Sequence, residues 1–195
     1  MHVYSSNDSR TSALGTISLC AVVVSIAANI LFSKITFLPG WIISAPTVAA
    51  SFGLLYKALD QYAWRWDALR KIGIIEVPVV DGKYVGELVS SYQGVRIPVS
   101  IRIDQTWTRI AIRFDVLAPA TSTSYSITAG LGRDGHNDAR LTYTYRNQTR
   151  PGVADADMND HDGTAEIVID CKTGKLSGRY FNFRGRQGTL DLMKQ

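Results

Sequence analysis

The chain has 195 residues, enough for one ordinary domain and a short additional segment. Its 21 Lys and Arg against 17 Asp and Glu give a formal net charge of +4, a mildly basic balance that suits an anionic partner or membrane surface without requiring either. The two cysteines, Cys20 and Cys171, do not suggest a disulfide scaffold, so we expect free thiols, as in a reducing compartment.

The charged residues divide the chain into two parts. Between Arg10 and Lys57 the only charged residue is Lys34, whereas charges of both signs occur at ordinary soluble density from Lys57 onward. We therefore expect residues 1–75 to form an N-terminal tail, an apolar anchor and a linker, and residues 76–195 to form one soluble domain.

The apolar part contains two stretches that suit membrane-spanning helices. Leu14–Phe32 has no charge, and at a rise of about 1.5 Å per residue it matches a hydrocarbon core of about 30 Å. A second stretch, Ile35–Tyr56, follows after a short turn, which predicts a helical hairpin. The alternative is a signal peptide followed by a buried core helix, but the first stretch lacks a basic cluster before it.

Flanking charges predict the orientation of this hairpin. Basic residues follow the second stretch, whereas the turn between the stretches carries only Lys34. Because cytoplasmic flanks are enriched in Lys and Arg, we expect a two-pass membrane protein with both termini and the soluble domain in the cytoplasm. Small residues at Ala45, Ala49 and Gly53 would allow close approach of another helix.

After Pro78 the hydrophobic period changes to two. Apolar and polar residues alternate along Val95–Asp104, Arg109–Val116 and Arg140–Arg146. Five further strands are expected at Tyr84–Ser90, Ser122–Leu131, Thr164–Asp170, Leu176–Phe183 and Gly188–Met193. The fold class is therefore mainly β, an eight-stranded antiparallel up-and-down β-barrel of lipocalin-like shape after two transmembrane α-helices. An open two-sheet sandwich is the alternative.

The start of the first strand, Gly82-Lys83-Tyr84-Val85-Gly86, resembles the glycine–aromatic motif of lipocalin-type barrels. In those barrels the aromatic residue closes the floor against a basic residue of the final strands. The resemblance implies this role for Tyr84 with Arg184 or Arg186. It concerns the architecture and not the transport of lipids.

Several segments in a fixed order carry a wider resemblance. After the two apolar stretches come GKYVGEL, SSYQG, IRIDQTWTRI, LTYTYRN, DHDGTAEI and LSGRYFNFRGRQGTLDL. From Leu14 to Met193 the chain resembles the two-transmembrane, β-strand-rich effector family of bacterial CBASS, the cyclic-oligonucleotide-based anti-phage systems. The resemblance implies that a CD-NTase supplies a cyclic dinucleotide, which the barrel binds. Binding then promotes self-assembly in the inner membrane, membrane disruption and death of the infected cell.

The chemistry of a cyclic dinucleotide selects the candidate ligand-binding residues. Aromatic rings stack bases at about 1–3 kcal/mol each, and arginine forms charge-assisted hydrogen bonds with phosphate. The candidates are Tyr84, Gln105, Trp107, Ser124, Tyr143, Tyr145, Tyr180 and Arg184.

Sequence position gives each candidate its expected role. Tyr143 and Tyr145 share one strand face and can both point inward. Gln105 and Trp107 flank a strand turn that we place near a barrel mouth. Arg184 lies on the same strand face as Tyr180 and is the preferred phosphate contact; Ser124 lies in a hydroxyl-rich segment. Each candidate also has a purely structural alternative: a core tyrosine, a hairpin cap or a floor-closing arginine.

We find no sequence motif of an enzyme or a metal site. The chain lacks a Gly-x-Ser-x-Gly elbow, a phosphate-binding loop and a His-Glu-x-x-His motif. The acidic run from Asp155 to Asp162 lacks the glycine and the closing glutamate of a calcium loop. We expect a non-catalytic receptor without cofactor or metal, whose activating ligand is a cyclic dinucleotide. The alternative function is a membrane-tethered, lipocalin-like binder of an apolar ligand or lipid.

Overall fold

The computed structural model describes residues 1–7, 9–32, 40–92, 94–119, 121–135, 138–152 and 159–195. The chain forms two compact units: Met1–Asp8 together with Val77–Gln195, and Ser9–Glu76 between them in sequence. The N-terminal residues, which the sequence grouped with the anchor, thus belong to the same unit as the barrel.

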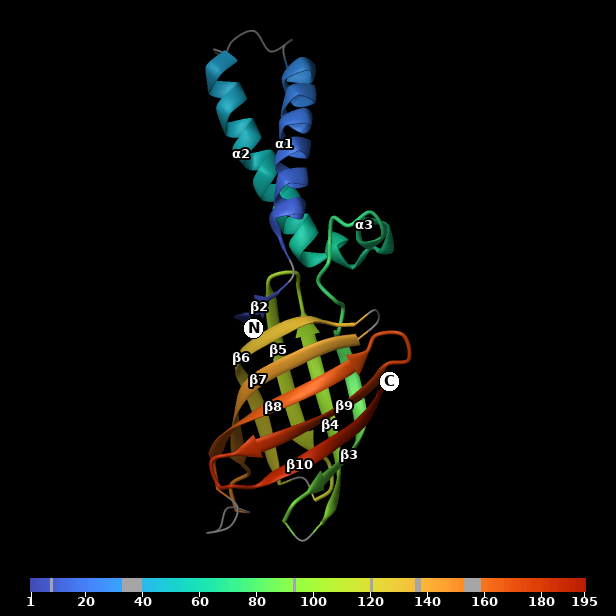
Figure 1. The fold of residues 1–195 in the computed structure, drawn as a ribbon. Helices are drawn as coiled ribbons and strands as arrows, with labels where there is room; N and C mark the ends of the chain where they lie inside the picture. Colours follow the sequence, from blue (N-terminus) through green and yellow to red (C-terminus); the bar gives the residue numbers. More distant parts are fainter. Residues whose placement is uncertain (8, 33–39, 93, 120, 136–137, 153–158) are drawn as a thin grey trace. The chain divides into compact units, whose positions relative to one another are not determined.

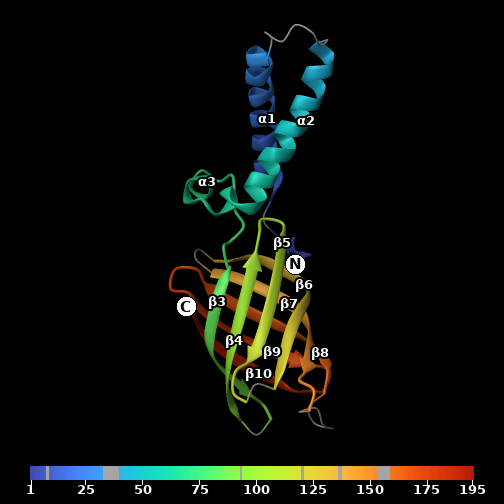
Figure 2. The ribbon, with the colours of Figure 1, turned by 180° about the vertical axis from the view of Figure 1, so that it is seen from behind.

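The larger unit is a closed β-barrel (Figures 1 and 2). Its strands are β3 (Gly82–Ser90), β4 (Arg96–Gln105), β5 (Arg109–Val116), β6 (Ser122–Asp134), β7 (Asp138–Thr149), β8 (His161–Asp170), β9 (Lys175–Asn182) and β10 (Gln187–Lys194). Each strand pairs antiparallel with the next, and β10 pairs with β3 to close the ring. The predicted eight-stranded up-and-down barrel is confirmed, and the open sandwich is excluded.

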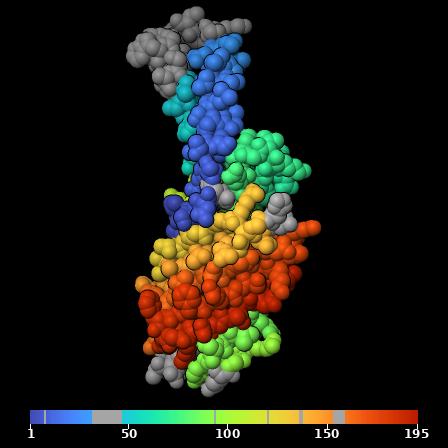
Figure 3. Space-filling model, in the orientation of Figure 1, coloured from blue at the N-terminus to red at the C-terminus, as the bar shows by residue number. Residues whose placement is uncertain are grey.

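The alternation seen in the sequence sets the inner face of the barrel. Ile101 and Ile103 of β4 are buried, whereas Arg102 between them is exposed. Ile103 pairs with Ile112 of β5, which is also buried. Each such side chain contributes about 1.5–3 kcal/mol through burial. In the space-filling view, the atoms of β7, β8, β9 and β10 lie directly against one another along the wall (Figure 3).

Two very short strands near the N-terminus join this barrel. β1 (His2–Val3) pairs antiparallel with β5, and β2 (Ser5–Ser6) pairs parallel with β6. They occupy the part of the barrel where β5 and β6 do not pair with each other. Two-residue strands are too short to produce a detectable period of two, so they could not be predicted from the hydrophobic pattern.

The smaller unit is helical. It contains α1 (Thr11–Phe32), α2 (Gly40–Gln61), a 3₁₀ turn at Ala63–Arg65 and α3 (Asp67–Lys71). Helices α1 and α2 pack against each other, and the Oγ atoms of Ser25 and Ser51 lie 3.4 Å apart across this contact. The buried positions on α1 recur every fourth residue and are mostly small: Ala13, Ile17, Ala21 and Ser25.

Helix α1 has the properties of a membrane span, with Thr11–Leu31 long and apolar enough to cross a bilayer. Among the residues that the structure describes, it is the one helix that meets this criterion, so a second span is not confirmed. Residues 33–39, where the sequence predicts a turn, and the side chain of Ala45 lie outside the described residues. Large apolar side chains are exposed on α1: Leu14, Leu19, Val22, Val23, Val24, Ile26, Ile30 and Leu31.

Candidate functional site: a cavity at one end of the barrel

The barrel encloses a cavity of about 160 Å³ near one of its ends. It is lined at the end of β3 by Ser90, at the start of β6 by Ser122, at the end of β7 by Asn147 and at the start of β8 by His161. These positions all belong to the end of the barrel opposite the start of β3. We call this end the mouth, and the end at Gly82 the closed end.

Three tyrosines form the wall of the cavity. Tyr143 and Tyr145 are successive inward residues of β7, with ring centroids 6.2 Å apart, and Tyr180 projects from β9. Burial raises the pKa of the Tyr143 hydroxyl, and the neighbouring Tyr145 raises it further. Burial, followed by the proximity of Tyr180, likewise raises the pKa of Tyr145. Tyr143 and Tyr145 therefore present neutral hydroxyls at physiological pH.

Glycines on the neighbouring strands make room for two of these rings. Gly163 of β8 is the cross-strand partner of Tyr145, and a Cβ atom there would overlap the tyrosine ring. Gly188 of β10 is the partner of Tyr180, and its Cβ would lie 2.6 Å from Cε1 of that ring. The sequence interpretation missed both glycines, although Gly188 lies in the predicted strand Gly188–Met193 and Gly163 directly precedes the predicted strand Thr164–Asp170.

Hydrogen bonds fix the polar part of the lining. Ser124 donates to Oδ1 of Asn147 at 2.9 Å, and both residues are buried. At the β9–β10 turn, Oδ1 of Asn182 accepts hydrogen bonds from the backbone N–H groups of Arg184 (3.0 Å) and Arg186 (3.2 Å). This turn carries the two arginines to the rim of the cavity. Sequence reasoning missed Asn147 and Asn182, because each is an isolated polar residue without a motif.

The charged residues among the described cavity lining are two arginines. Arg184, Arg186 and His161 line the cavity, and the lining residues that the structure describes include no Asp or Glu. The guanidinium carbon of Arg186 also lies 4.4 Å from the centre of the Tyr92 ring. A cationic rim above aromatic walls suits an anionic ligand that carries flat rings.

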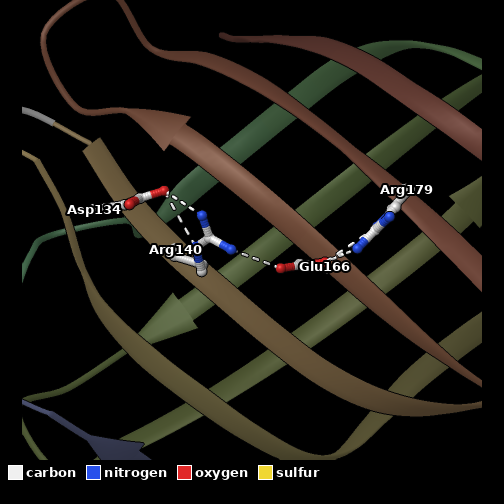
Figure 4. Close-up of polar contacts among 4 residues, drawn as sticks. All are labelled: Asp134, Arg140, Glu166 and Arg179. Carbon is white, nitrogen blue, oxygen red and sulfur yellow. Dashed lines mark hydrogen bonds and ion pairs between the residues drawn. The ribbon is translucent and has the colours of Figure 1, made fainter.

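On the outer face of the barrel, Arg140 and Arg179 form ion pairs with carboxylates (Figure 4). Arg140 bridges Asp134 at 2.7 Å and Glu166 at 2.8 Å, and Arg179 binds the other oxygen of Glu166 at 2.8 Å. The hydrogen bond from Arg179 is the main reason why the pKa of the Glu166 carboxyl is lowered. Strands β7 and β9 thus carry paired arginines on the outer face and tyrosines on the inner face.

Five of the eight predicted ligand-binding residues come together at the cavity: Ser124, Tyr143, Tyr145, Tyr180 and Arg184. The other three, Tyr84, Gln105 and Trp107, are buried at the closed end. There Gln105 accepts a hydrogen bond from the N–H of Val80 at 2.9 Å and donates to the carbonyl of Pro78 at 3.0 Å. The sequence predicted the β4–β5 turn near a barrel mouth, but the structure places this turn at the closed end.

The closed end also departs from the lipocalin-type arrangement. Tyr84 donates its hydroxyl to the carbonyl of Val80 at 2.9 Å, which seals the floor as the motif implied. The cation over its ring, however, is Lys194, whose Nζ lies 5.9 Å from the ring centre. Arg184 and Arg186 lie at the mouth instead, because the β9–β10 turn is at the end of the barrel away from Tyr84.

Comparison with known proteins agrees with this geometry. Residues 75–194 match the family model "Cap15, cyclic dinucleotide receptor domain". CD-NTase-associated protein 15 of Yersinia aleksiciae is 29% identical over 160 residues, a match that spans 80% of this chain and 74% of that protein. The resemblance to CBASS effectors that the sequence motifs indicated is confirmed. The chain belongs to the Cap15 family of cyclic dinucleotide receptors.

Proposed function

We propose that this protein is a membrane-anchored CBASS effector whose barrel binds a cyclic dinucleotide in the cavity at its mouth. The observation that carries the proposal is the composition of the cavity. Three tyrosines form its walls, two arginines stand at its rim, and no carboxylate occurs among the described lining residues. A ligand with two bases and two phosphates offers a complementary set of groups.

The depth of each residue suggests how the ligand is oriented. Tyr143 and Tyr145 are buried, whereas Arg184 and Arg186 are partly exposed. We infer that a base stacks inside against the tyrosines while the phosphates remain near the arginines at the rim. The hydroxyl of Ser124 and the amide of Asn147 provide a donor and acceptor pair for a base edge or ribose.

Titration of the full-length protein in detergent micelles or nanodiscs with a panel of cyclic dinucleotides tests the proposal. We expect saturable binding of at least one member, measured by calorimetry. Absence of binding by every member at concentrations well above micromolar would contradict it. Full-length protein is required because residues 1–8 belong to the barrel unit.

The barrel is proposed to lie in the cytoplasm, joined to a two-pass anchor. Residues on both sides of the helical unit, Met1–Asp8 and Val77–Gln195, belong to one folded unit. If α1 crosses the bilayer, the chain must cross back before Val77, which favours a second span through α2. External protease should leave the barrel intact in whole cells and digest it after permeabilisation. Digestion in intact cells, or a freely soluble full-length protein, would contradict this topology.

Ligand-induced assembly and membrane disruption form the last part of the proposal. Ala49 and Gly53 lie on an exposed face of α2, and the space beside Gly53 is open. A second copy could pack closely there, as small residues permit in membranes. Gly53→Leu should reduce toxicity in cells without weakening dinucleotide binding. Unchanged toxicity would remove this helix face from the mechanism.

Apolar residues in the cavity favour one alternative, a receptor for a lipid or another apolar ligand. Leu88, Ile97, Phe114, Val116 and Leu190 line part of the wall. Mass spectrometry of material extracted from the purified protein separates the two functions. A co-purified fatty acid or lipid would support the alternative, and a nucleotide would support the cyclic dinucleotide receptor.

A further inference from the structure

The N-terminal segment Met1–Ser6 lies in a gap between two barrel strands. Strands β5 and β6 pair only over Arg113–Asp115 and Thr123–Tyr125. Beyond these residues, toward the closed end, β1 pairs with Arg109 and Ile110 of β5, and β2 pairs with Gly130 and Leu131 of β6. We call the edges at 109–112 and 126–131 the seam.

One buried side chain anchors this segment, whose other residues are exposed or partly exposed. Tyr4 is 2% exposed, and its hydroxyl donates a hydrogen bond of 2.8 Å to the carbonyl of Trp107. Its neighbour Val3 is 67% exposed. Backbone pairing combined with one deeply inserted aromatic residue is how sheet edges recognise extended peptides.

The barrel side of the seam is shaped for this occupant. Ser126 Oγ lies 2.8 Å from Nε2 of His2 and also accepts the N–H of Ile112 at 3.0 Å. Ser126 lies next to an irregularity in the β6–β7 pairing, where the register shifts between Ser126 and Thr128. Gly130 leaves room for Ser5, because a Cβ there would lie 3.1 Å from the Ser5 hydroxyl.

The segment is also separate from the receptor domain in sequence. Residues 9–76 intervene between it and the rest of the barrel unit, and the family match begins only at residue 75. The eight strands of the ring pair around the full circle without it, through the β5–β6 contact near the mouth. The segment therefore resembles a bound peptide more than an integral strand.

We propose that the seam is a second binding site of the barrel, a groove for an extended peptide, and that its ligand is the chain's own segment Met1–Ser6. Tyr4 is the specificity-determining side chain, and the backbone edges of β5 and β6 supply the remaining contacts. Since none of the seam pairs involves a residue of the cavity lining, the site can be tested without any nucleotide.

The test uses full-length protein in which residues 2–6 are replaced by a Gly/Ser linker of equal length. The probe is a peptide of residues 1–8, fluorescently labelled at its C-terminus, and binding is followed by fluorescence anisotropy. We expect saturable binding to the replaced protein and much weaker binding to the wild type, whose seam is occupied. A Tyr4→Ala peptide should bind at least about tenfold more weakly, and a Val3→Ala peptide within about twofold of the original.

Two results would overturn the proposal. In the first, the replaced protein has the circular dichroism spectrum of the wild type but shows no saturable binding at peptide concentrations up to about 1 mM. The other is equal affinity of the Tyr4→Ala and original peptides. If the replaced protein does not fold, the proposal is tested instead by amide hydrogen exchange in full-length point variants. Tyr4→Ala should speed exchange at 109–112 and 130–131 by at least about tenfold, whereas Val3→Ala should not; equal exchange in both would also overturn it.

Discussion

The two ends of the barrel are built from the same strands but from different chemistry. At the closed end, Trp107 and Tyr84 are almost fully buried, and the Tyr84 hydroxyl is bound to a backbone carbonyl. At the mouth, Tyr145 and Tyr180 border a cavity with Arg184 at its rim. Inward aromatic residues of the same barrel therefore stabilise the fold at the closed end and border a cavity at the mouth.

The largest expected effect is on stability at the closed end. Trp107→Ala removes a large side chain that is 2% exposed, so the free energy of unfolding should fall by about 3–5 kcal/mol. Urea unfolding of the protein in micelles, followed by circular dichroism, measures this loss. The matched control is Phe183→Ala, because Phe183 is 89% exposed and should change stability by less than about 0.5 kcal/mol.

If Trp107→Ala left the unfolding free energy unchanged but weakened dinucleotide binding, the closed end would take part in recognition. Trp107 would then have the role that its sequence position first suggested.

The hairpin order explains why the sequence placed Gln105 and Trp107 at the wrong end. Alternation along β4 shows which residues face inward, but it does not show how deep each lies along the barrel axis. In an up-and-down barrel, successive turns alternate between the two ends. The chain begins β3 at the closed end, so the β4–β5 turn returns to that end and the β9–β10 turn lies at the mouth.

Most of the barrel could nevertheless be predicted. All eight strands were expected within a few residues, because alternation along Val99–Ile103 and Leu141–Tyr145 is regular. The N-terminal strands could not be predicted, since their partners are more than 100 residues away in sequence. The same applies to Gly163 and Gly188, whose importance depends on which tyrosine each faces across the sheet.

The next largest effect is expected for the rim of the cavity. Arg184→Ala removes a charged donor, and hydrogen bonds to charged groups contribute about 1.5–3 kcal/mol, so the dissociation constant for the cyclic dinucleotide should rise about 10- to 150-fold. Calorimetric titration measures the change. The unfolding transition should stay in place, because Arg184 is partly exposed.

Arg179→Ala is the matched control, since Arg179 is an arginine of the same hairpin whose guanidinium binds Glu166 on the outer face. It should bind the dinucleotide with wild-type affinity. An equal loss in both variants would indicate that the overall positive charge attracts the ligand, without a specific contact at the mouth.

A smaller effect is expected for the buried hydroxyl of Ser124. Ser124→Ala should weaken dinucleotide binding by about two- to tenfold, because one neutral hydrogen bond contributes about 0.5–1.5 kcal/mol and the Asn147 amide loses its positioning donor. Ser177→Ala, on an exposed position of β9, provides the control and should bind normally. Equal affinity of the two variants would restrict recognition to the aromatic and cationic residues.

The smallest effect concerns the tyrosines of the cavity wall, and it appears only in alkaline solution. Burial raises the pKa of Tyr143 and Tyr145 in the folded protein above the value of about 10 for an exposed tyrosine. Above pH of about 10 the unfolded chain releases these protons while the folded barrel retains them, so stability should be constant below this pH and fall as pH rises further. Urea titrations from pH 7 to 11 test this, and Tyr143→Phe should make the alkaline decline shallower. An alkaline decline that is unchanged by Tyr143→Phe would mean that the Tyr143 hydroxyl is solvated, and the mouth would then differ from the closed end more than its burial indicates.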